Sequence, residues 1–572
     1  MRLSLPAILR LSLPAILRLS LPAILPLSLP AILLLSLPAL AAFGAPGSSA
    51  TATSTGAAGG LFSGEPIPDA ASGGAGLFSE EPAPGASLEE SPLLAGVPAL
   101  MSTGYPRLTS RLRLGADFGI DTSFDRRGEQ VAELELNAAL ELRAELSESL
   151  SALVAPKIAH VSALSREGDD RYLLYLDVPE AHITWALGPF HLRAGTIVFA
   201  WGASDLISPS DVLNPLDLRR TPFGAPEEVK VPVLAAEGVV VLGPITFRAV
   251  IEPVFTASRF FVYAWDNGLG PLIEAYGLPL PNLAPVLGPS VIDHFGDQLV
   301  VTDRPNDGPT HATLGLRATA ALGDLELSST FVHGFDAFPE IRFDPNLLVV
   351  AQAMIDSIGA GVPLNLLDPE LLEAIGQIQE AIGQGRDLYT ATYRRRTLIG
   401  GDAVLGLDPF VLKLDVAYTF GRTLFTQTLD PVRQPWLNAV LGIEYVDGEH
   451  LQIILEAFVV GIFDVRSNYR LLVLEPRAAP PSTLDAGART LGVPGLAGVV
   501  RYTILEGEVS FEIGAFGTLT RGDLILAPTV RWRLSDHHLV RLSGLLVEGR
   551  RDGYGGTYTT NDQLVLGYEW SL

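Results

Sequence analysis

The stretch from Val131 to Leu146 constrains the fold most, because apolar and polar residues alternate along it with a period of two. From Ala132 onward, leucine or alanine takes every even position, while mostly Glu, Asn and Arg take the odd ones. A helix would scatter the leucines around its circumference, whereas a strand places them on one face. The length and the single apolar face predict a transmembrane β-strand with lipid outside and water inside. An amphipathic helix that happens to alternate is the alternative, and helix propensity favours it.

Similar alternation continues from residue 105 to the C-terminus and is interrupted by tight turns that contain Gly, Pro, Asp or Ser. These turns are Ser147–Ser149, Gly188-Pro189, Gly243-Pro244, Gly323-Asp324, Asp408-Pro409, Asp447-Gly448-Glu449, Glu506-Gly507 and Ser535-Asp536-His537. Longer connections alternate with them, at roughly 200–228, 255–311, 335–388, 422–435 and 461–494. We therefore predict an all-β fold for residues 105–572: a transmembrane antiparallel up-and-down barrel of about 18 strands, with 16 as the alternative.

The alternation also assigns a direction to each side chain of the predicted barrel. Leu136, Leu140, Leu414 and Val530 are expected to face lipid, and Thr529 to face inward. Short turns of bacterial outer-membrane barrels are periplasmic and long loops are external. An even number of strands then places both ends of the barrel on the periplasmic side.

Composition excludes several classes of protein. The net charge of −25 argues against a nucleic-acid partner, and the absence of cysteine excludes disulfides and thiolate metal sites. Outside the N-terminus there is no uninterrupted apolar run of about 18 residues, so a helical membrane protein is not expected.

The first hundred residues have a different composition from the rest. Leu-Ser-Leu-Pro recurs with a period of eight in residues 1–45, which we interpret as an expanded signal peptide ending near Ala41 or Ala45, with a retained membrane anchor as the alternative. Residues 46–104 are rich in Gly, Ala, Ser and Pro and are expected to form a disordered periplasmic linker. Its repeated Gly-Leu-Phe-Ser motifs, at 60–63 and 76–79, could bind a periplasmic partner or could be duplicated sequence without function.

Two further segments have recognisable patterns. Asp368-Pro369-Glu370 is a typical helix start, and apolar residues at helical spacing follow it; Leu347 to Ile358 predicts a second helix. This helical insertion could plug the barrel or pack on itself outside it. The last strand, from about Asp562 to Leu572, resembles the C-terminal signal that the barrel assembly machinery recognises, although it ends in Leu rather than an aromatic residue.

Charged residues at inward positions are expected to line the lumen and to orient polar solutes, although mutual pairing in a wet lumen is their ordinary explanation. They are Arg111, Arg113, Glu133, Glu135, Glu141, Lys413, Asp415, Arg531, Arg533 and Arg541.

The stretch 193–222 has the densest set of polar residues, and its prolines stiffen it. We expect this loop to fold into the lumen and to narrow it, with Trp201 as an apolar anchor; a surface loop on lipopolysaccharide is the alternative. The residues expected at the constriction are Trp201, Asp205, Asp211, Asp217, Arg219 and Arg220.

Within this stretch, Trp201-Gly202, Asn214-Pro215 and Asp217 match a segment of a known group. The chain here resembles a domain-of-unknown-function family of Gram-negative outer-membrane barrel proteins. An Arg-Gln pair that usually follows the glycine is absent, because Thr196-Ile197 follows Gly195. The resemblance spans about thirty residues and implies a porin-like barrel for uptake or export of poorly soluble organic compounds or lipids.

Enzyme signals are weak, since the nine histidines are scattered and no metal, nucleotide or serine-hydrolase motif is present. No cofactor and no metal are expected; acidic residues between Asp293 and Asp307 could bridge lipopolysaccharide through divalent cations.

The sequence predicts a passive, substrate-selective channel of the outer membrane for small polar or poorly soluble organic solutes. An outer-membrane enzyme or a lipid or export accessory factor on the same scaffold is the main alternative; a secreted soluble β-protein would need polar outward faces. Expected partners are outer-membrane lipid, lipopolysaccharide and the solute.

Overall fold

The computed structural model describes residues 106–121, 130–165, 171–217, 229–259, 305, 311–360, 364–425, 431–447, 450–464, 470–471, 482–483, 490–519, 522–549 and 562–572. All of them belong to one compact unit, Asp69–Leu572. The predicted signal peptide and linker, the Gly-Leu-Phe-Ser motifs and the acidic residues between Asp293 and Asp307 lie outside the described ranges.

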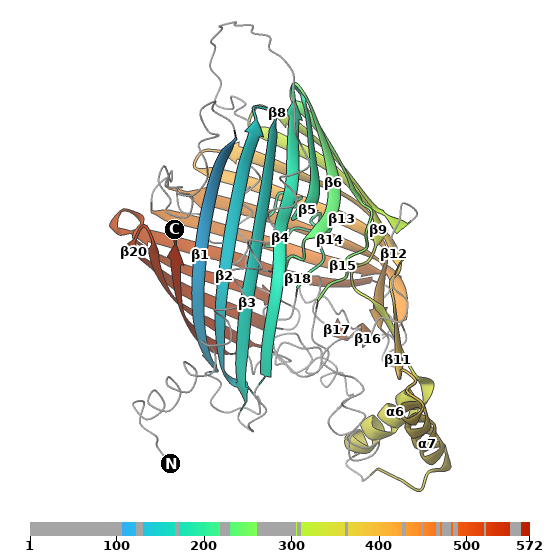
Figure 1. The fold of residues 1–572 in the computed structure, drawn as a ribbon. Coiled ribbons are helices and arrows are strands. Elements are labelled where there is room, and N and C mark those ends of the chain that lie inside the picture. The colour runs from blue at the N-terminus through green and yellow to red at the C-terminus, as the bar shows by residue number, and fades with distance from the viewer. Residues whose placement is uncertain are drawn as a thin grey trace, which may run out of the picture. The chain divides into compact units, whose positions relative to one another are not determined.

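Eighteen strands form one antiparallel sheet that closes on itself (Figure 1). They are β1 (Arg107–Asp121), β2 (Gln130–Ser147), β3 (Leu150–Ser165), β4 (Arg171–Leu187), β5 (Phe190–Ile197), β6 (Val233–Leu242), β7 (Ile245–Glu252), β8 (Thr313–Leu322), β9 (Leu325–Phe335), β12 (Arg395–Leu407), β13 (Phe410–Phe425), β14 (Pro431–Val446), β15 (Leu451–Phe463), β18 (Thr490–Ile504), β19 (Val509–Thr518), β20 (Asp523–Ser535), β21 (His538–Glu548) and β22 (Gln563–Ser571). Each pairs with the next, and β22 pairs back with β1. The predicted up-and-down barrel of 18 strands is confirmed.

The stretch that alternates most regularly forms β2, and it pairs with β1 and β3. Helix propensity is overridden because the leucines share one face of the sheet and the charges share the other. Seven of the eight predicted tight turns lie wholly within the described ranges, and each joins two paired strands. The eighth is described only at Asp447 and joins β14 to β15.

Burial alternates along the strands, which separates an outer apolar face from an inner polar one. Outward leucines are exposed, such as Leu176 at 65% and Leu414 at 43%, whereas Thr529 points inward and is 5% exposed. An apolar outer face in contact with water would be costly, because about 25 cal/mol is lost for each Å² left exposed.

The long connection between β9 and β12 contains the predicted helices. α6 (Pro345–Ala360) and α7 (Pro369–Gly383) pack against each other, and the Asp368 carboxylate accepts a 2.9 Å hydrogen bond from the Glu370 backbone nitrogen. A two-stranded ribbon, β10 (Glu340–Phe343) and β11 (Tyr389–Thr392), flanks the helices in sequence. A second ribbon consists of β16 (Arg470–Leu471) and β17 (Ser482–Thr483).

Candidate functional site

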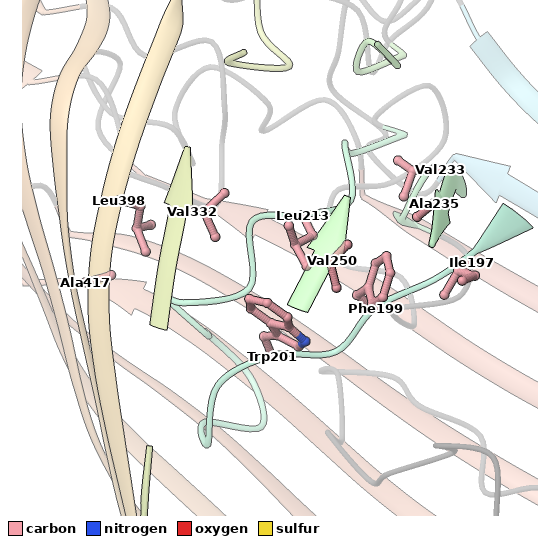
Figure 2. Packing of buried hydrophobic residues seen from close by; sticks show 10 residues of the cluster. All are labelled: Ile197, Phe199, Trp201, Leu213, Val233, Ala235, Val250, Val332, Leu398 and Ala417. Carbon is pink, nitrogen blue, oxygen red and sulfur yellow. The ribbon is translucent and has the colours of Figure 1, made fainter. Parts of the chain in front are cut away.

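The segment 198–217 follows β5 directly and packs against the inner face of the barrel wall. Phe199, Trp201 and Leu213 belong to an apolar cluster whose other members point inward from the strands (Figure 2). These wall residues are Ile197, Val233, Ala235, Val250, Val332, Leu398 and Ala417. Trp201 is 3% exposed. The cluster forms an apolar base through which the segment covers the inner faces of β6 to β13. We call 198–217 the inner segment.

Two buried polar side chains tie this base to the neighbouring chain. The Asn214 side chain accepts a hydrogen bond from the Phe199 backbone nitrogen at 2.6 Å and donates to the carbonyl oxygens of Ile197 and Val231. Lys230 donates to the Phe199 carbonyl at 2.6 Å and forms a 2.5 Å ion pair with Asp211. Buried polar groups need such partners, so these bonds fix where the segment enters and leaves the wall.

The tip of the inner segment is held by Glu456, which points inward from β15. Its carboxylate accepts hydrogen bonds from three consecutive backbone nitrogens, those of Asp205, Leu206 and Ile207, at 2.7, 3.1 and 3.0 Å. Glu456 is 1% exposed. Three N–H donors converge on this one side chain, which satisfies backbone groups that would otherwise be buried unpaired.

Two residues of β13 complete the attachment of the tip. Asp415 accepts hydrogen bonds from the hydroxyls of Ser208 and Ser210 at 2.7 and 2.6 Å. Lys413 donates to Asp205 at 2.5 Å and to Glu444 of β14 at 2.8 Å. Burial raises the pKa of the Asp205 carboxyl above its usual range, although the charge of Lys413 opposes this shift.

The inner segment therefore reaches far around the barrel. It leaves the wall at β5 and contacts β15, with β6, β7, β8, β9, β12, β13 and β14 between them in the sheet. Close approach to the wall requires small residues. Gly202 has φ of 102°, and a Cβ there would lie 1.9 Å from Ser208 Oγ and 2.4 Å from Asp415 Oδ2.

A belt of ion pairs lies on the turn side of the apolar base. On β5, Arg193 precedes Ile197 and binds Glu237 of β6 at 2.9 Å; Arg248 of β7 lies 3.7 Å from the same carboxylate. Arg317 of β8 donates to both oxygens of Asp402 of β12, at 2.7 and 2.9 Å. Sequence analysis did not single out these pairs, because each joins residues of different hairpins or strands.

The structure describes four of the six expected constriction residues. Trp201, Asp205 and Asp211 lie in the inner segment with the contacts described above. Asp217 is at its end, 3.6 Å from Arg259, which also binds Asp177 of β4 at 2.7 Å. Arg219 and Arg220 lie outside the described residues.

The expected lumen-lining residues point inward but do not form one group. Lys413 and Asp415 hold the inner segment, whereas Arg531 contacts Glu512 at 3.3 Å and Arg541 contacts Asp117 at 2.9 Å. The others lie on strands away from the tip: Arg111 and Arg113 on β1, Glu133, Glu135 and Glu141 on β2, and Arg533 on β20. Arg111 pairs in register with Glu141.

The sequence did not indicate that Glu456, Asn214 and Lys230 hold the inner segment in place. For Glu456 a signal was present, because it is the one charged residue in the otherwise apolar strand Ile453–Phe463. A carboxylate in such a run needs a buried partner.

Within the described ranges, no group of three or more His, Cys, Asp or Glu side chains is placed to hold a metal ion. None of the described helices is both long and apolar enough to cross a membrane.

No protein-family model matches the chain, and no curated protein matches it. Among solved structures, the chain is similar to OccK7 (OpdD) of Pseudomonas aeruginosa, at 10% identity and a TM-score of 0.41, over 82% of this chain and 99% of that one. It is also similar to OccAB3 of Acinetobacter baumannii, at 9% identity and a TM-score of 0.40, over 82% and 99%. The outer-membrane channel DcaP of Acinetobacter baumannii has 9% identity and a TM-score of 0.35, over 82% and 99%. At these sequence identities and TM-scores, the similarity does not assign a function to this chain.

Proposed function

We propose that this chain is a passive, substrate-selective channel of a Gram-negative outer membrane, for small polar or poorly soluble organic solutes. Flux runs down a gradient and needs no cofactor. An 18-strand barrel encloses a lumen too wide for side chains of the wall alone to fill.

The outer face supports the membrane location. Exposed aromatic side chains lie on it close to the tight turns and again towards the other rim, on either side of exposed leucines. Near the turns they are Trp185, Phe190, Phe247, Phe410, Tyr502, Phe511, Trp532 and Tyr568; towards the other rim they are Phe118, Tyr172 and Phe420. Two aromatic girdles around an apolar band are typical of outer-membrane barrels.

The observation that carries the proposal is the attachment of the inner segment to Glu456 and Asp415. A loop inside a barrel reduces the free cross-section, and its buried ion pairs and hydrogen bonds hold it in one position. The narrowed passage screens solutes by size and polarity. In this proposal Trp201, Asp205, Asp211, Asp217, Arg219 and Arg220 border the constriction, and the inward Arg and Glu residues line the rest of the lumen.

Three finer statements belong to the same proposal. The chain belongs to the domain-of-unknown-function family that its Trp201-Gly202 and Asn214-Pro215 segment resembles. The barrel assembly machinery recognises β22, whose Leu564, Leu566 and Tyr568 are exposed on the outer face. The linker of residues 46–104 faces the periplasm and binds a partner there.

Replacing residues 203–210 by a three-residue Gly-Ser linker tests the constriction. A short linker can close the gap because the two ends of the removed part are close together: the backbone nitrogen of Trp201 lies 3.4 Å from the carboxylate of Asp211. Single-channel recording in planar bilayers should show a larger conductance and altered ion preference for the shortened chain. Equal conductance and equal ion selectivity in both chains would contradict a constriction role. Absence of any channel activity in the folded parent chain would refute the channel itself.

A further inference from the structure

A cluster of basic side chains lies on the outer face, at the rim opposite the tight turns. Arg395 begins β12, His333 is near the end of β9, and Arg433 is near the start of β14. Their neighbours Arg396, Val332 and Gln434 are buried and point inward, so these three side chains point outward. This is notable in a chain whose net charge is −25.

Backbone carbonyls hold the Arg433 guanidinium in place. Its Nε and Nη2 donate to the Gly421 carbonyl at 3.0 and 2.8 Å, and Nη2 also donates to the Arg395 carbonyl at 2.5 Å. Gly421 provides the room, because a Cβ there would lie 2.8 Å from Nη2. No carboxylate of the described residues pairs with Arg433, and its Nη1 group has no described hydrogen bond, so a rigid cationic donor is presented outward.

The two neighbouring groups extend this donor surface. The Arg395 guanidinium lies over the Phe335 ring, 4.6 Å from its centroid, and His333 Nδ1 is 2.9 Å from the Thr397 hydroxyl. The exposed Arg342 and Arg394 near the same rim both pair with Glu340.

Aromatic rings mark the depth of the cluster. Phe420 pairs in register with Thr397, and the rings of Phe420 and Tyr418 are 4.7 Å apart. Arg395 lies two residues beyond Thr397, towards the long connections. Aromatic side chains gather at the boundary between hydrocarbon and head groups, so the cluster lies at the level of head groups.

We propose that Arg395, Arg433 and His333 form a binding site for the phosphate groups of lipopolysaccharide. The assignment rests on the proposed function, which makes the rim with long connections external and so places it in the leaflet that contains lipopolysaccharide. Arginine guanidinium groups bind phosphate through paired charge-assisted hydrogen bonds. The apolar face beneath the cluster, with Phe420 and Ile399 about half exposed, accommodates acyl chains of the same lipid.

The test is lipid binding to the purified, folded chain in detergent, measured by native mass spectrometry. Three probes are used: bisphosphorylated lipopolysaccharide, the same lipid after removal of its phosphates, and phosphatidylglycerol. The double variant Arg395→Gln/Arg433→Gln should bind the bisphosphorylated lipid at least about tenfold more weakly, because it loses charge-assisted hydrogen bonds to the phosphates. Removing the phosphates should weaken binding to the parent chain by a similar factor.

The double variant Arg113→Gln/Arg533→Gln is the matched control, because it removes the same charge from inward positions. It should bind lipopolysaccharide as the parent chain does. We call Arg395→Gln/Arg433→Gln the rim variant. If it binds lipopolysaccharide as tightly as the parent chain does, or if the parent chain binds lipopolysaccharide equally with and without its phosphates, the proposal is overturned. Phosphatidylglycerol could also bind as tightly as lipopolysaccharide and lose binding to the same extent in the Arg395→Gln/Arg433→Gln variant. That result would overturn the choice of lipid.

Heat-modifiable migration on a gel verifies that each variant is folded. If the double variant does not fold, the single variants Arg433→Gln and Arg433→Lys decide, because the second keeps the charge and should weaken binding less than the first. Conductance separates this proposal from the channel. The rim variant should conduct as the parent does, and a parent chain that binds lipopolysaccharide without conducting would refute the channel alone.

Discussion

Oε1 of Glu456 lies 2.7 Å from the backbone nitrogen of Asp205, although 251 positions separate the two residues in the chain. One carboxylate on β15 thus positions the tip of a segment that leaves the wall at β5. The same carboxylate accepts from Leu206 and Ile207, so a single side chain satisfies three buried donors.

We predict that Glu456→Ala releases the tip. Three backbone N–H groups would lose their acceptor, at about 1–3 kcal/mol for each group left buried and unpaired. The tip should then leave the wall and become mobile, and single-channel recordings should show altered mean conductance and increased current noise. Glu456→Gln retains one oxygen acceptor and should have an intermediate effect.

Glu512→Gln is the control for this variant. Glu512 is also an inward carboxylate, 2% exposed, but it pairs with Arg501 and Arg531 and not with the inner segment. Current noise equal in Glu456→Ala, Glu512→Gln and the parent chain would mean that Glu456 does not position the tip.

Gly202→Ala should distort the inner segment without opening the barrel. The φ of 102° is strained for a residue with a side chain, at about 1–3 kcal/mol, and the new Cβ would collide with Ser208 Oγ and Asp415 Oδ2. Conductance should change while heat-modifiable migration remains. Gly243→Ala is the comparison, because Gly243 also has positive φ but has nothing within 4 Å of its Cβ position; a conductance change there of the same size would rule out the collision as the cause.

The strands and turns could be predicted because their causes are local. Alternation of Leu134 to Leu146 with polar residues determines the two faces of β2, and turn residues such as Gly188-Pro189 end the strands. The helix after Asp368 was predictable for the same reason, since the cap and the apolar spacing lie within fifteen residues. Every one of these signals is contained in a short window of sequence.

The partners of the inner segment could not be predicted in this way. The density of Asp, Asn and Arg drew attention to 193–222, but the residues that hold it, Lys413, Asp415 and Glu456, come from strands more than 200 positions away. Alternation assigned Lys413 and Asp415 an inward direction without showing what they contact. Which inward charge meets which part of the loop depends on barrel closure and register, which no local pattern contains.

A charge on the outer face should destabilise the barrel far more than the same charge on the inner face. Leu542 and Ser543 are neighbours near the middle of β21; Leu542 is outward and 45% exposed, and Ser543 points inward. Leu542→Arg should cost about 2–4 kcal/mol in folding into a bilayer, whereas Ser543→Arg should cost much less. Urea titration of folding into lipid vesicles measures both. Equal losses of stability would contradict lipid contact for this face.

The last prediction concerns the pH dependence of the β10–β11 ribbon. Burial of Glu340 raises the pKa of its carboxyl, but the hydrogen bonds and charges of Arg342 and Arg394 outweigh burial and hold this pKa below its ordinary value of 4.5. The carboxyl is 4% exposed and lies 2.7 Å from Arg342 and 3.3 Å from Arg394. A lowered folded pKa means that the stabilisation is complete above the ordinary pKa and is lost as pH falls through the folded value.

Amide hydrogen exchange of residues 340–343 and 389–392, measured across a series of pH values, should therefore show a protection loss on acidification, after correction for the intrinsic rates. In Glu340→Gln, protection should already be low at neutral pH and should not fall further, because the titrating group is absent. If the two chains lose protection in parallel on acidification, another group controls the ribbon and Glu340 does not.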